Sequence, residues 1–307
     1  MRPGAAIGPY ALERELGRGS AGLVFRARDP ASGEAVAVKL LRPKRAGSEQ
    51  ARQRFLREVE ALVRLRHPNV VGVRAAGEHA GSPWVALDLV EGEPLSRRLA
   101  RGGRLELGQA LAIGAALASA LAHCHARNVL HRDLNPTNVL LRRGDDAPFL
   151  VDFGLARDVE LDTSDSRTQL TLEGRLLGTP GYGSPEQMSG DLERVGPASD
   201  VFGLGATIYA MVAGRPPWEG DDLLELVVGM ETPPEPPSRE NRAVPAALDR
   251  LLLRCLAADP GARPDAADLA RELVAIAGGG SARPRLLLAA LLGLLLAGGL
   301  FLALAGR

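Results

Sequence analysis

The chain has 307 residues, 46% of them hydrophobic and 24% charged, and its 37 basic residues balance its 37 acidic residues. This composition is typical of a globular protein long enough for two packed lobes and an appendage, and it argues against a disordered chain. A net charge of zero gives no indication of nucleic-acid binding. Two widely spaced cysteines, Cys124 and Cys255, argue against a disulfide framework and for core residues in a reducing compartment.

The N-terminal part of the chain has patterns that are typical of β-strands. Residues 10–41 alternate apolar and polar side chains in short runs, which glycines and the sequence DPASGE interrupt. This alternation predicts three antiparallel strands with a glycine-rich first turn. Residues 48–65 then follow a helical period, and two more strands are expected around 70–76 and 84–89.

The remainder of the chain is predominantly helical in pattern. Apolar-rich segments at 106–126, 198–213 and 246–257 have the length and period of helices, and the proline-rich stretch at 231–240 is typical of a surface loop. The sequence therefore predicts an α+β fold. It has a small lobe, built from an antiparallel sheet and one helix, and a larger helical lobe.

The C-terminal segment of the chain is uncharged. Residues 286–306 contain no charged side chain, and at about 1.5 Å per residue they would span about 30 Å, the thickness of a bilayer core. A buried core helix is the alternative, but the globular pattern already ends near Ile276. We expect a transmembrane helix at 286–306, a juxtamembrane linker at 277–285, and a cytoplasmic folded part, because Arg283 and Arg285 flank the span on that side.

This segment also carries a pattern that is typical of helix pairing in membranes. Ala289, Gly293 and Ala297 recur every four residues, and small residues at this spacing let two transmembrane helices approach closely. Such residues are common in transmembrane helices, so the chain could be a single-pass monomer or a homodimer in the cell membrane.

The sequence GRGSAG at 17–22, followed by Val24, has the spacing of a phosphate-binding glycine motif. Dinucleotide-binding folds use a similar spacing, but they need a helix after the glycines. Here the residues LVFRARD continue as a strand, so the glycines lie in a hairpin that can cover phosphates. Lys39 ends a following strand in VAVK and is one of only two lysines in the chain, the other being Lys44. A compact ammonium group at this place indicates a contact with phosphate.

The sequence HRDLNPTN at 131–138 supplies groups that phosphoryl transfer requires. In such a reaction the protein mainly positions the reactants and neutralises charge. Carboxylate and amide oxygens, which Asp133, Asn138 and Asp152 offer, are the ligands that Mg²⁺ prefers. The run His123–Cys124–His125 is not expected to form a metal site, because three consecutive positions of a helix cannot converge.

In combination, these motifs resemble those of the eukaryotic-type Ser/Thr protein kinases that bacteria anchor in the membrane. The resemblance runs from Tyr10 to Ile276. It includes, in chain order, HPNVV at 67–71, PWVALDLVEG at 83–92, DFG at 152–154, GTPGYGSPEQ at 178–187, SDVFGLG at 199–205 and DPGARP at 259–264. The family implies a kinase domain at 10–276, with a small lobe at 10–90 and a large lobe at 91–276, after an N-terminal tail at 1–9.

The resemblance also implies where ATP binds. Leu87 would be the gatekeeper of the linker between the lobes, and the backbone of Asp88 and Val90 would reach the base. The full set of expected ATP-binding residues is Leu16, Gly17, Arg18, Gly19, Ser20, Ala21, Gly22, Leu23, Val24, Ala37, Lys39, Leu87, Asp88 and Val90.

For catalysis, the resemblance implies four residues: Asp133, Lys39, Glu58 and Asn135. Asp133 would accept or orient the proton of the substrate hydroxyl, and Glu58 would hold Lys39 against the phosphates. Asn138 and Asp152 would bind Mg²⁺, for which Mn²⁺ could substitute.

The resemblance further implies regulatory and supporting residues. Arg132 would bind a phosphate on the activation loop, at Thr171 in the first place or at Thr168. Thr179 would shape the substrate site, Asp200 would anchor the catalytic loop, and Arg263 would pair with Glu186.

Two positions depart from the family pattern. Asn135 replaces a lysine that contacts the γ-phosphate, and Ser184 replaces the alanine that usually precedes Pro-Glu. Tyrosine kinases lack this lysine too, so its loss does not exclude activity. The sequence thus predicts an ATP-dependent Ser/Thr protein kinase that acts on protein substrates at the membrane. The alternative, a pseudokinase that serves as a membrane scaffold, is supported by Asn135 alone.

Overall fold

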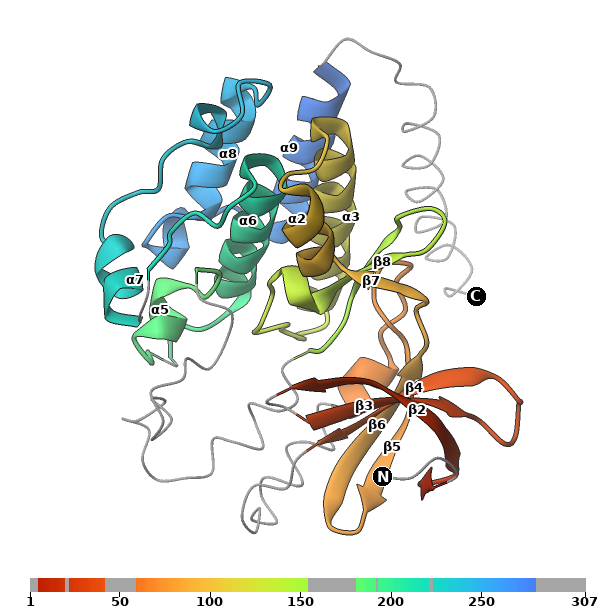
Figure 1. The fold of residues 1–307 in the computed structure, drawn as a ribbon. Helices are drawn as coiled ribbons and strands as arrows, with labels where there is room; N and C mark the ends of the chain where they lie inside the picture. Colours follow the sequence, from red (N-terminus) through yellow and green to blue (C-terminus); the bar gives the residue numbers. More distant parts are fainter. Residues whose placement is uncertain are drawn as a thin grey trace, which may run out of the picture.

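The computed structural model describes residues 5–19, 22–41, 59–153, 181–191, 193–220 and 223–279, which form a strand-rich lobe and a helical lobe (Figure 1). The expected transmembrane segment, with its small-residue face, lies outside the described residues. Among the described residues, one helix is long and apolar enough to cross a membrane, Leu107–His125. It packs against other helices of the large lobe, so it is a core helix of that lobe.

The small lobe is a six-stranded antiparallel sheet with the order β1-β2-β3-β4-β6-β5. Its strands are β1 (Ala6–Ile7), β2 (Tyr10–Gly19), β3 (Gly22–Arg28), β4 (Ala35–Leu41), β5 (Val73–His79) and β6 (Ser82–Asp88). The three strands predicted within 10–41 are present, and the predicted helix over 48–65 is described, and helical, at residues 59–63. β1 was not expected, since residues 1–9 were predicted to be a tail, yet Ile7 is fully buried in the sheet's outer core.

The two faces of this sheet have different surroundings. Phe25, Val38 and Trp84 belong to the core cluster on the outer face, which β1 and the start of β2 help to cover. Residues alternate between faces along a strand, so Ala37 and Lys39 of β4 lie on the opposite face. The large lobe covers this inner face of the sheet.

The large lobe contains a three-stranded sheet and the helices. The strands are β7 (Gly92–Pro94), β8 (Val139–Arg142) and β9 (Pro148–Leu150). The helices are α2 (Leu95–Gly102), α3 (Leu107–His125), α5 (Pro185–Met188), α6 (Pro197–Ala213), α7 (Leu223–Gly229), α8 (Ala246–Cys255) and α9 (Ala266–Gly279), with 3₁₀ turns at Pro136–Asn138, Pro237–Arg239 and Pro260–Ala262.

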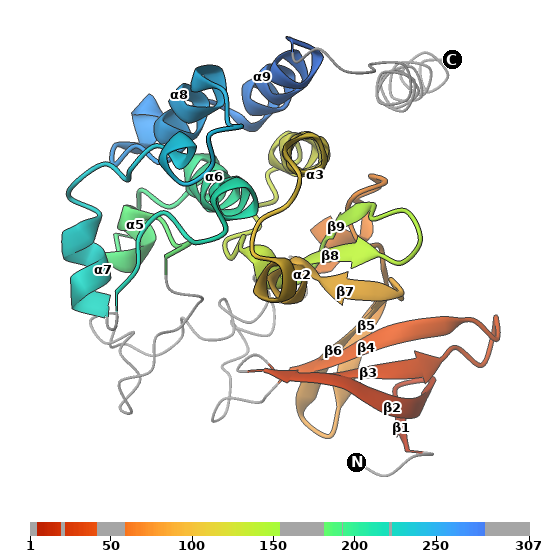
Figure 2. The same ribbon diagram turned by 45° about the horizontal axis from the view of Figure 1, so that its top comes forward.

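Helix α6 is the centre of the large lobe, with α3 and α8 packed beside it and α9 against α3 (Figure 2). Every residue from Ser199 to Val212 is buried, which is expected of a helix that neighbouring elements surround on all sides. The helix ends at Gly214, whose φ of 87° lies in the left-handed region that favours glycine. This central helix carries the residues that fix the catalytic loop.

Contacts on either side of β5 and β6 join the lobes. Before β5, the N–H of Val71 donates to the carbonyl oxygen of Leu150 in β9 at 3.1 Å. After β6, Glu91 accepts a bond from Arg26 of β3 through its carboxylate at 2.6 Å, and one from the N–H of Arg143 through its carbonyl oxygen at 2.8 Å. The sheet is therefore tied to the large lobe next to its edge strand β5 and through its central strand β3.

Candidate active site

The loop at 131–138 is anchored from below by Asp200 of α6. One carboxylate oxygen of Asp200 accepts the N–H of His131 at 2.8 Å, and the other accepts the N–H of Arg132 at 2.7 Å. His125 of α3 lies 2.9 Å from the same carboxylate through Nε2. α6 can approach this closely because residue 203 is glycine: a Cβ there would lie 2.6 Å from the carbonyl oxygen of Leu134.

His131 is fully buried and joins the loop to the segment that carries Asp152. Its Nε2 lies 3.0 Å from the carbonyl oxygen of Val151, and its Nδ1 lies 3.4 Å from the N–H of Asp133. A carbonyl oxygen can only accept and an N–H can only donate, so the neutral ring with its proton on Nε2 satisfies both contacts. The ring also packs against Phe153, with 4.7 Å between the ring centroids.

Asn138 binds Asp133 directly. Its side-chain amide nitrogen donates to the carbonyl oxygen of Asp133 at 2.7 Å and to the carboxylate oxygen Oδ2 at 2.9 Å. These bonds fix the direction of the Asp133 carboxylate. The amide oxygen of Asn138 is then the atom that faces away from Asp133, as a metal ligand must.

The Asn135 side chain forms hydrogen bonds within its own loop. Its Oδ1 accepts the N–H of Thr137 at 2.9 Å, its Nδ2 donates to the carbonyl oxygen of Asp133 at 3.1 Å, and 3% of the residue is exposed. It therefore caps the 3₁₀ turn Pro136–Asn138. An asparagine closed onto its own loop does not reach outward as a long lysine side chain would.

Lys39 and Asp152 form an ion pair between the lobes. The Lys39 side chain is 8% exposed and the Asp152 side chain is 38% exposed, so the carboxylate is the partner that faces solvent. Asp152 has a φ of 66°, a conformation that few residues other than glycine adopt. Glu58, the expected partner of Lys39, lies outside the described residues.

The inner face of the sheet brings together four of the side chains that were expected to contact the nucleotide. Lys39 pairs with Val24 across β3 and β4, and Ala37 pairs with Leu87 across β4 and β6. Side chains of directly opposed residues share a face. Leu23 was expected to belong to this set, but its side chain packs against the outer core of the sheet, so only its backbone can reach a nucleotide.

The glycines of the hairpin do not share one role. A Cβ at Gly22 would lie 2.1 Å from the carbonyl oxygen of Leu40, so packing alone requires glycine there. At Gly17 and Gly19 a Cβ would meet no atom of the described residues within 4 Å. Arg18 points to Glu15, with which it forms an exposed ion pair at 3.1 Å, and Leu16 is 40% exposed.

In the linker between the lobes, Asp88 is held by hydrogen bonds to Gly72, the residue before β5, and to Arg74 of β5. Its N–H donates to the carbonyl oxygen of Gly72 at 2.9 Å, and its carboxylate accepts Nε of Arg74 at 2.6 Å. Since both of these groups have partners, the carbonyl oxygen of Asp88 is the backbone atom that can meet a base. Val90 follows in the irregular stretch before β7.

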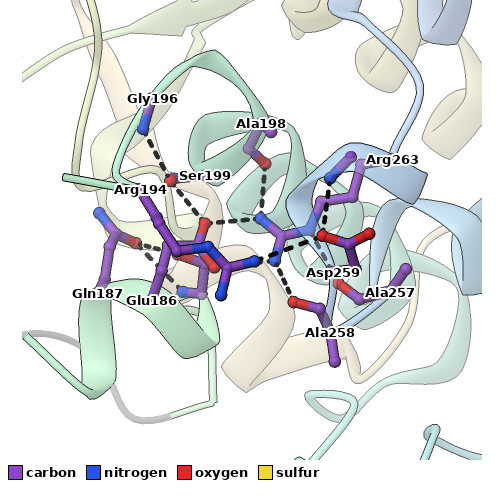
Figure 3. Close-up of polar contacts among 12 residues, drawn as sticks. Glu186, Gln187, Arg194, Gly196, Ala198, Ser199, Ala257, Ala258, Asp259 and Arg263 are labelled. Atoms are coloured by element: carbon purple, nitrogen blue, oxygen red, sulfur yellow. Dashed lines mark hydrogen bonds and ion pairs between the residues drawn. The ribbon is translucent and has the colours of Figure 1, made fainter. Parts of the chain in front are cut away.

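Glu186 of α5 and Arg263 form a bidentate ion pair at 2.7 and 2.9 Å, with side chains 1% and 0% exposed. All five N–H groups of Arg263 are bonded, the other three to the carbonyl oxygens of Ala257, Ala198 and Ala258 (Figure 3). Burial alone would raise the pKa of Glu186, but hydrogen bonds from Arg263 and Ser199 outweigh it and lower the pKa to about 2. The pair therefore stays charged at neutral pH.

Several expected residues lie outside the described part of the chain, namely Ser20, Ala21, Thr168, Thr171 and Thr179. The described residues contain no group of three or more His, Cys, Asp or Glu side chains that could hold a metal ion. Burial raises the pKa of both cysteine thiols to about 12, so they are inert core residues.

Sequence reasoning missed Gln187. Its side-chain amide nitrogen donates to the carbonyl oxygen of Arg132 at 2.8 Å, which links α5 to the catalytic loop. A glutamine after Pro-Glu carries no signal of such a bond, because the acceptor is a backbone atom that lies 55 residues away in sequence.

Comparisons with known proteins give a consistent result. Residues 10–274 match the family model of the protein kinase domain. The serine/threonine-protein kinase PkaA of Streptomyces coelicolor is 39% identical over 292 residues, which cover 91% of this chain and 51% of PkaA. The serine/threonine-protein kinase PknD of Mycobacterium tuberculosis is 35% identical over 270 residues, 87% of this chain and 39% of PknD. The chain thus spans about half the length of these curated relatives, or less.

Among solved structures, the kinase domain of PknI from Mycobacterium tuberculosis superposes with a TM-score of 0.71 and 30% sequence identity. The match covers 91% of this chain and 99% of the PknI chain. The expected two-lobed architecture, with a β-sheet lobe and a helical lobe, is confirmed.

Proposed function

This chain belongs to the protein kinase domain family, and from that premise we propose that it transfers the γ-phosphate of ATP to serine and threonine hydroxyls of proteins. The relatives over most of its length are named serine/threonine-protein kinases. The chain covers only part of those relatives, so its activity and substrates are inferred from its own site.

One observation supports the proposal most directly: among the described residues, the side chains that we expect to act in phosphate transfer are held by bonds within the site. Asn138 holds the Asp133 carboxylate at 2.9 Å, and Asp200 holds the backbone just before it. Asp133 accepts or orients the proton of the attacking hydroxyl. Lys39 supplies a buried positive charge on the sheet face that meets the phosphates, and in this structure it is paired with Asp152.

The donor set fits a hard divalent cation. Asp152 offers a carboxylate and Asn138 an amide oxygen, which are the ligand types that Mg²⁺ prefers. When bound, Mg²⁺ would neutralise the charge that develops on the phosphate oxygens. Mn²⁺ accepts the same ligands.

Asn135 has a structural task in this proposal. It caps the turn that carries Asn138 and bonds the carbonyl oxygen of Asp133. The Asn135 side chain therefore helps to hold the loop in this conformation, although it lacks the charge of the family's lysine. This favours a working kinase over the alternative of a pseudokinase scaffold.

Two further features complete the proposal. We infer that residues 286–306 anchor the kinase in the cell membrane as a single span, with the folded part in the cytoplasm, because they are uncharged over the thickness of a bilayer core. Phosphorylation at Thr171 or Thr168 would activate the enzyme through Arg132, since a phosphate forms strong bonds with a guanidinium group.

The experiment compares wild type with Asp133→Asn, using ATP labelled on the γ-phosphate and a fluorescent ATP analogue. We expect the variant to lose transfer to a protein substrate by at least about 100-fold and to bind the analogue as wild type does, because Asp133 serves the proton. Loss of nucleotide binding together with transfer would contradict this division of roles. Peptide mapping of the labelled wild type shows whether Thr171 or Thr168 carries phosphate.

A further inference from the structure

The backbone of Arg132, the residue that precedes Asp133, is held on both sides by side chains of other elements. Arg132 has a φ of 64°, which is uncommon for any residue other than glycine. Its N–H donates to Asp200 of α6 at 2.7 Å, and its carbonyl oxygen accepts Nε2 of Gln187 of α5 at 2.8 Å. Such a conformation persists only where the surroundings fix it.

The orientation of the Gln187 amide follows from its partners. Its Oε1 lies 3.1 Å from the backbone N–H of Ser184 and 3.2 Å from the Ser184 hydroxyl. A backbone N–H only donates and a carbonyl oxygen only accepts. The amide oxygen must therefore face Ser184, and the amide NH₂ must face the carbonyl oxygen of Arg132.

Gln187 also stands on a rigid support. Figure 3 shows it on the same short helix as Glu186, whose carboxylate is bound by the fully buried Arg263. Glu186 accepts a further bond from the hydroxyl of Ser199 in α6 at 2.6 Å. The backbone of α5 is thereby fixed to the helix that carries Asp200, so both contacts to Arg132 come from one connected framework.

We propose that Gln187 is a positioning residue for phosphate transfer, which fixes the Arg132–Asp133 peptide unit and couples the catalytic loop to the segment after the activation loop. The inference rests on the proposed role of Asp133 as the residue that orients the substrate hydroxyl. Ser184, which replaces the family's alanine, adds a hydroxyl donor that keeps the amide of Gln187 in this orientation.

A purely local role for Gln187 makes a different prediction. Accepting the N–H of Ser184 is enough to cap the start of α5. The second bond, to Arg132, contributes nothing to that cap. The two roles can therefore be separated by a substitution that keeps the acceptor atom and removes the donor.

Gln187→Glu is that substitution. Its carboxylate still accepts the N–H of Ser184, but it faces the carbonyl oxygen of Arg132 with no hydrogen to donate. With full-length chain at pH 7.5, we expect kcat to fall about tenfold, which corresponds to ~1.4 kcal/mol. KM for ATP and the urea midpoint should stay close to the wild-type values. As the pH is lowered towards 5.5, the introduced carboxyl gains a proton that it can donate, so the ratio of variant to wild-type kcat should rise.

Ser189→Ala is the matched control. Ser189 lies at the exposed end of the same helix, and its hydroxyl donates only to the carbonyl oxygen of Glu186, at 3.3 Å. Its kcat should equal that of wild type. Wild-type kcat in Gln187→Glu, or a reduced kcat that does not recover on acidification, would overturn the inference. A wild-type chain that binds ATP but transfers no phosphate would instead overturn the proposed function, and this inference with it.

Discussion

Replacing Arg263 by methionine should destabilise the protein strongly, because the change leaves Glu186 as a buried, unpaired carboxylate. The substitution removes five donors, two of which bind Glu186 at 2.7 and 2.9 Å. Breaking a buried pair by removing one partner costs about 3–5 kcal/mol. With an m-value of about 3 kcal/mol per molar urea, the unfolding midpoint should fall by about 1 M or more.

The matched control for this change is Arg254→Met. Arg254 also pairs with a glutamate, Glu272 at 2.6 Å, but their side chains are 50% and 44% exposed. Exposed pairs of this kind contribute about 0–1 kcal/mol. Urea unfolding followed by circular dichroism measures both variants. Equal midpoints for the two variants would refute the reasoning, because the Arg263 pair is buried and Arg263 also binds three carbonyl oxygens, whereas the Arg254 pair is exposed.

The same ion pair predicts a dependence of stability on pH. Folding lowers the pKa of Glu186 from its ordinary value of 4.5 to about 2, which contributes about 3 kcal/mol at neutral pH. A lowered carboxyl pKa stabilises the fold fully above pH 4.5, and this stabilisation is lost as the pH falls to 2. In Glu186→Gln the loss over this range should be smaller than in wild type by about that amount.

The glycine hairpin and the catalytic loop give two further predictions. Gly22→Ala should lower the urea midpoint, because a Cβ there would lie 2.1 Å from the carbonyl oxygen of Leu40. Gly19→Ala should leave the midpoint unchanged and raise KM for ATP, because a Cβ there meets no described atom within 4 Å. Equal urea midpoints for the two variants would contradict the packing role of Gly22. Asn135→Ala should lower kcat about tenfold with little change in KM for ATP, since it removes bonds to Asp133 and Thr137; an unchanged kcat in steady-state assays would show that the cap does not matter for catalysis.

The sequence predicted those parts of the site in which a recognisable motif contains the interacting side chains. Asp200 lies under the catalytic loop and Arg263 pairs with Glu186, as the resemblance to the kinase family implied. Both contacts involve a buried carboxylate, which needs hydrogen-bond donors close to it. A buried carboxylate requires a partner, and the family motif that contains Arg263 implied which residue it is.

Contacts between a side chain and the backbone were much harder to predict. Asn135 was noted in the sequence as the replacement of a lysine, and nothing in the sequence indicated that its amide closes onto the loop. Gln187 carried no signal at all, and Leu23 was placed in the nucleotide site although its side chain points to the outer core. The face to which a side chain points depends on register and bulges, and the pairing of β2 with β3 contains two register shifts, both within β2.

Boundaries were also imprecise where a turn lacked a strong signal. The strands predicted around 70–76 and 84–89 are found at Val73–His79 and Ser82–Asp88, joined by Ala80 and Gly81 with φ of 50° and 76°. A two-residue turn with both φ positive favours Asn-Gly or Gly-Gly. Because alanine rarely adopts a positive φ, Ala80 at the first position gave no indication of this turn.

The most direct test of the central claim is transfer of labelled γ-phosphate from ATP by the full-length chain, with wild type and Lys39→Met compared in the presence of Mg²⁺. The substitution removes the buried ammonium group that pairs with Asp152 and little of the packing. We predict label on serine and threonine of the wild-type chain or of an added protein substrate, and a loss of at least about 100-fold in the variant at unchanged stability. Equal labelling by the two chains, or no transfer by a wild-type chain that binds ATP, would contradict the account.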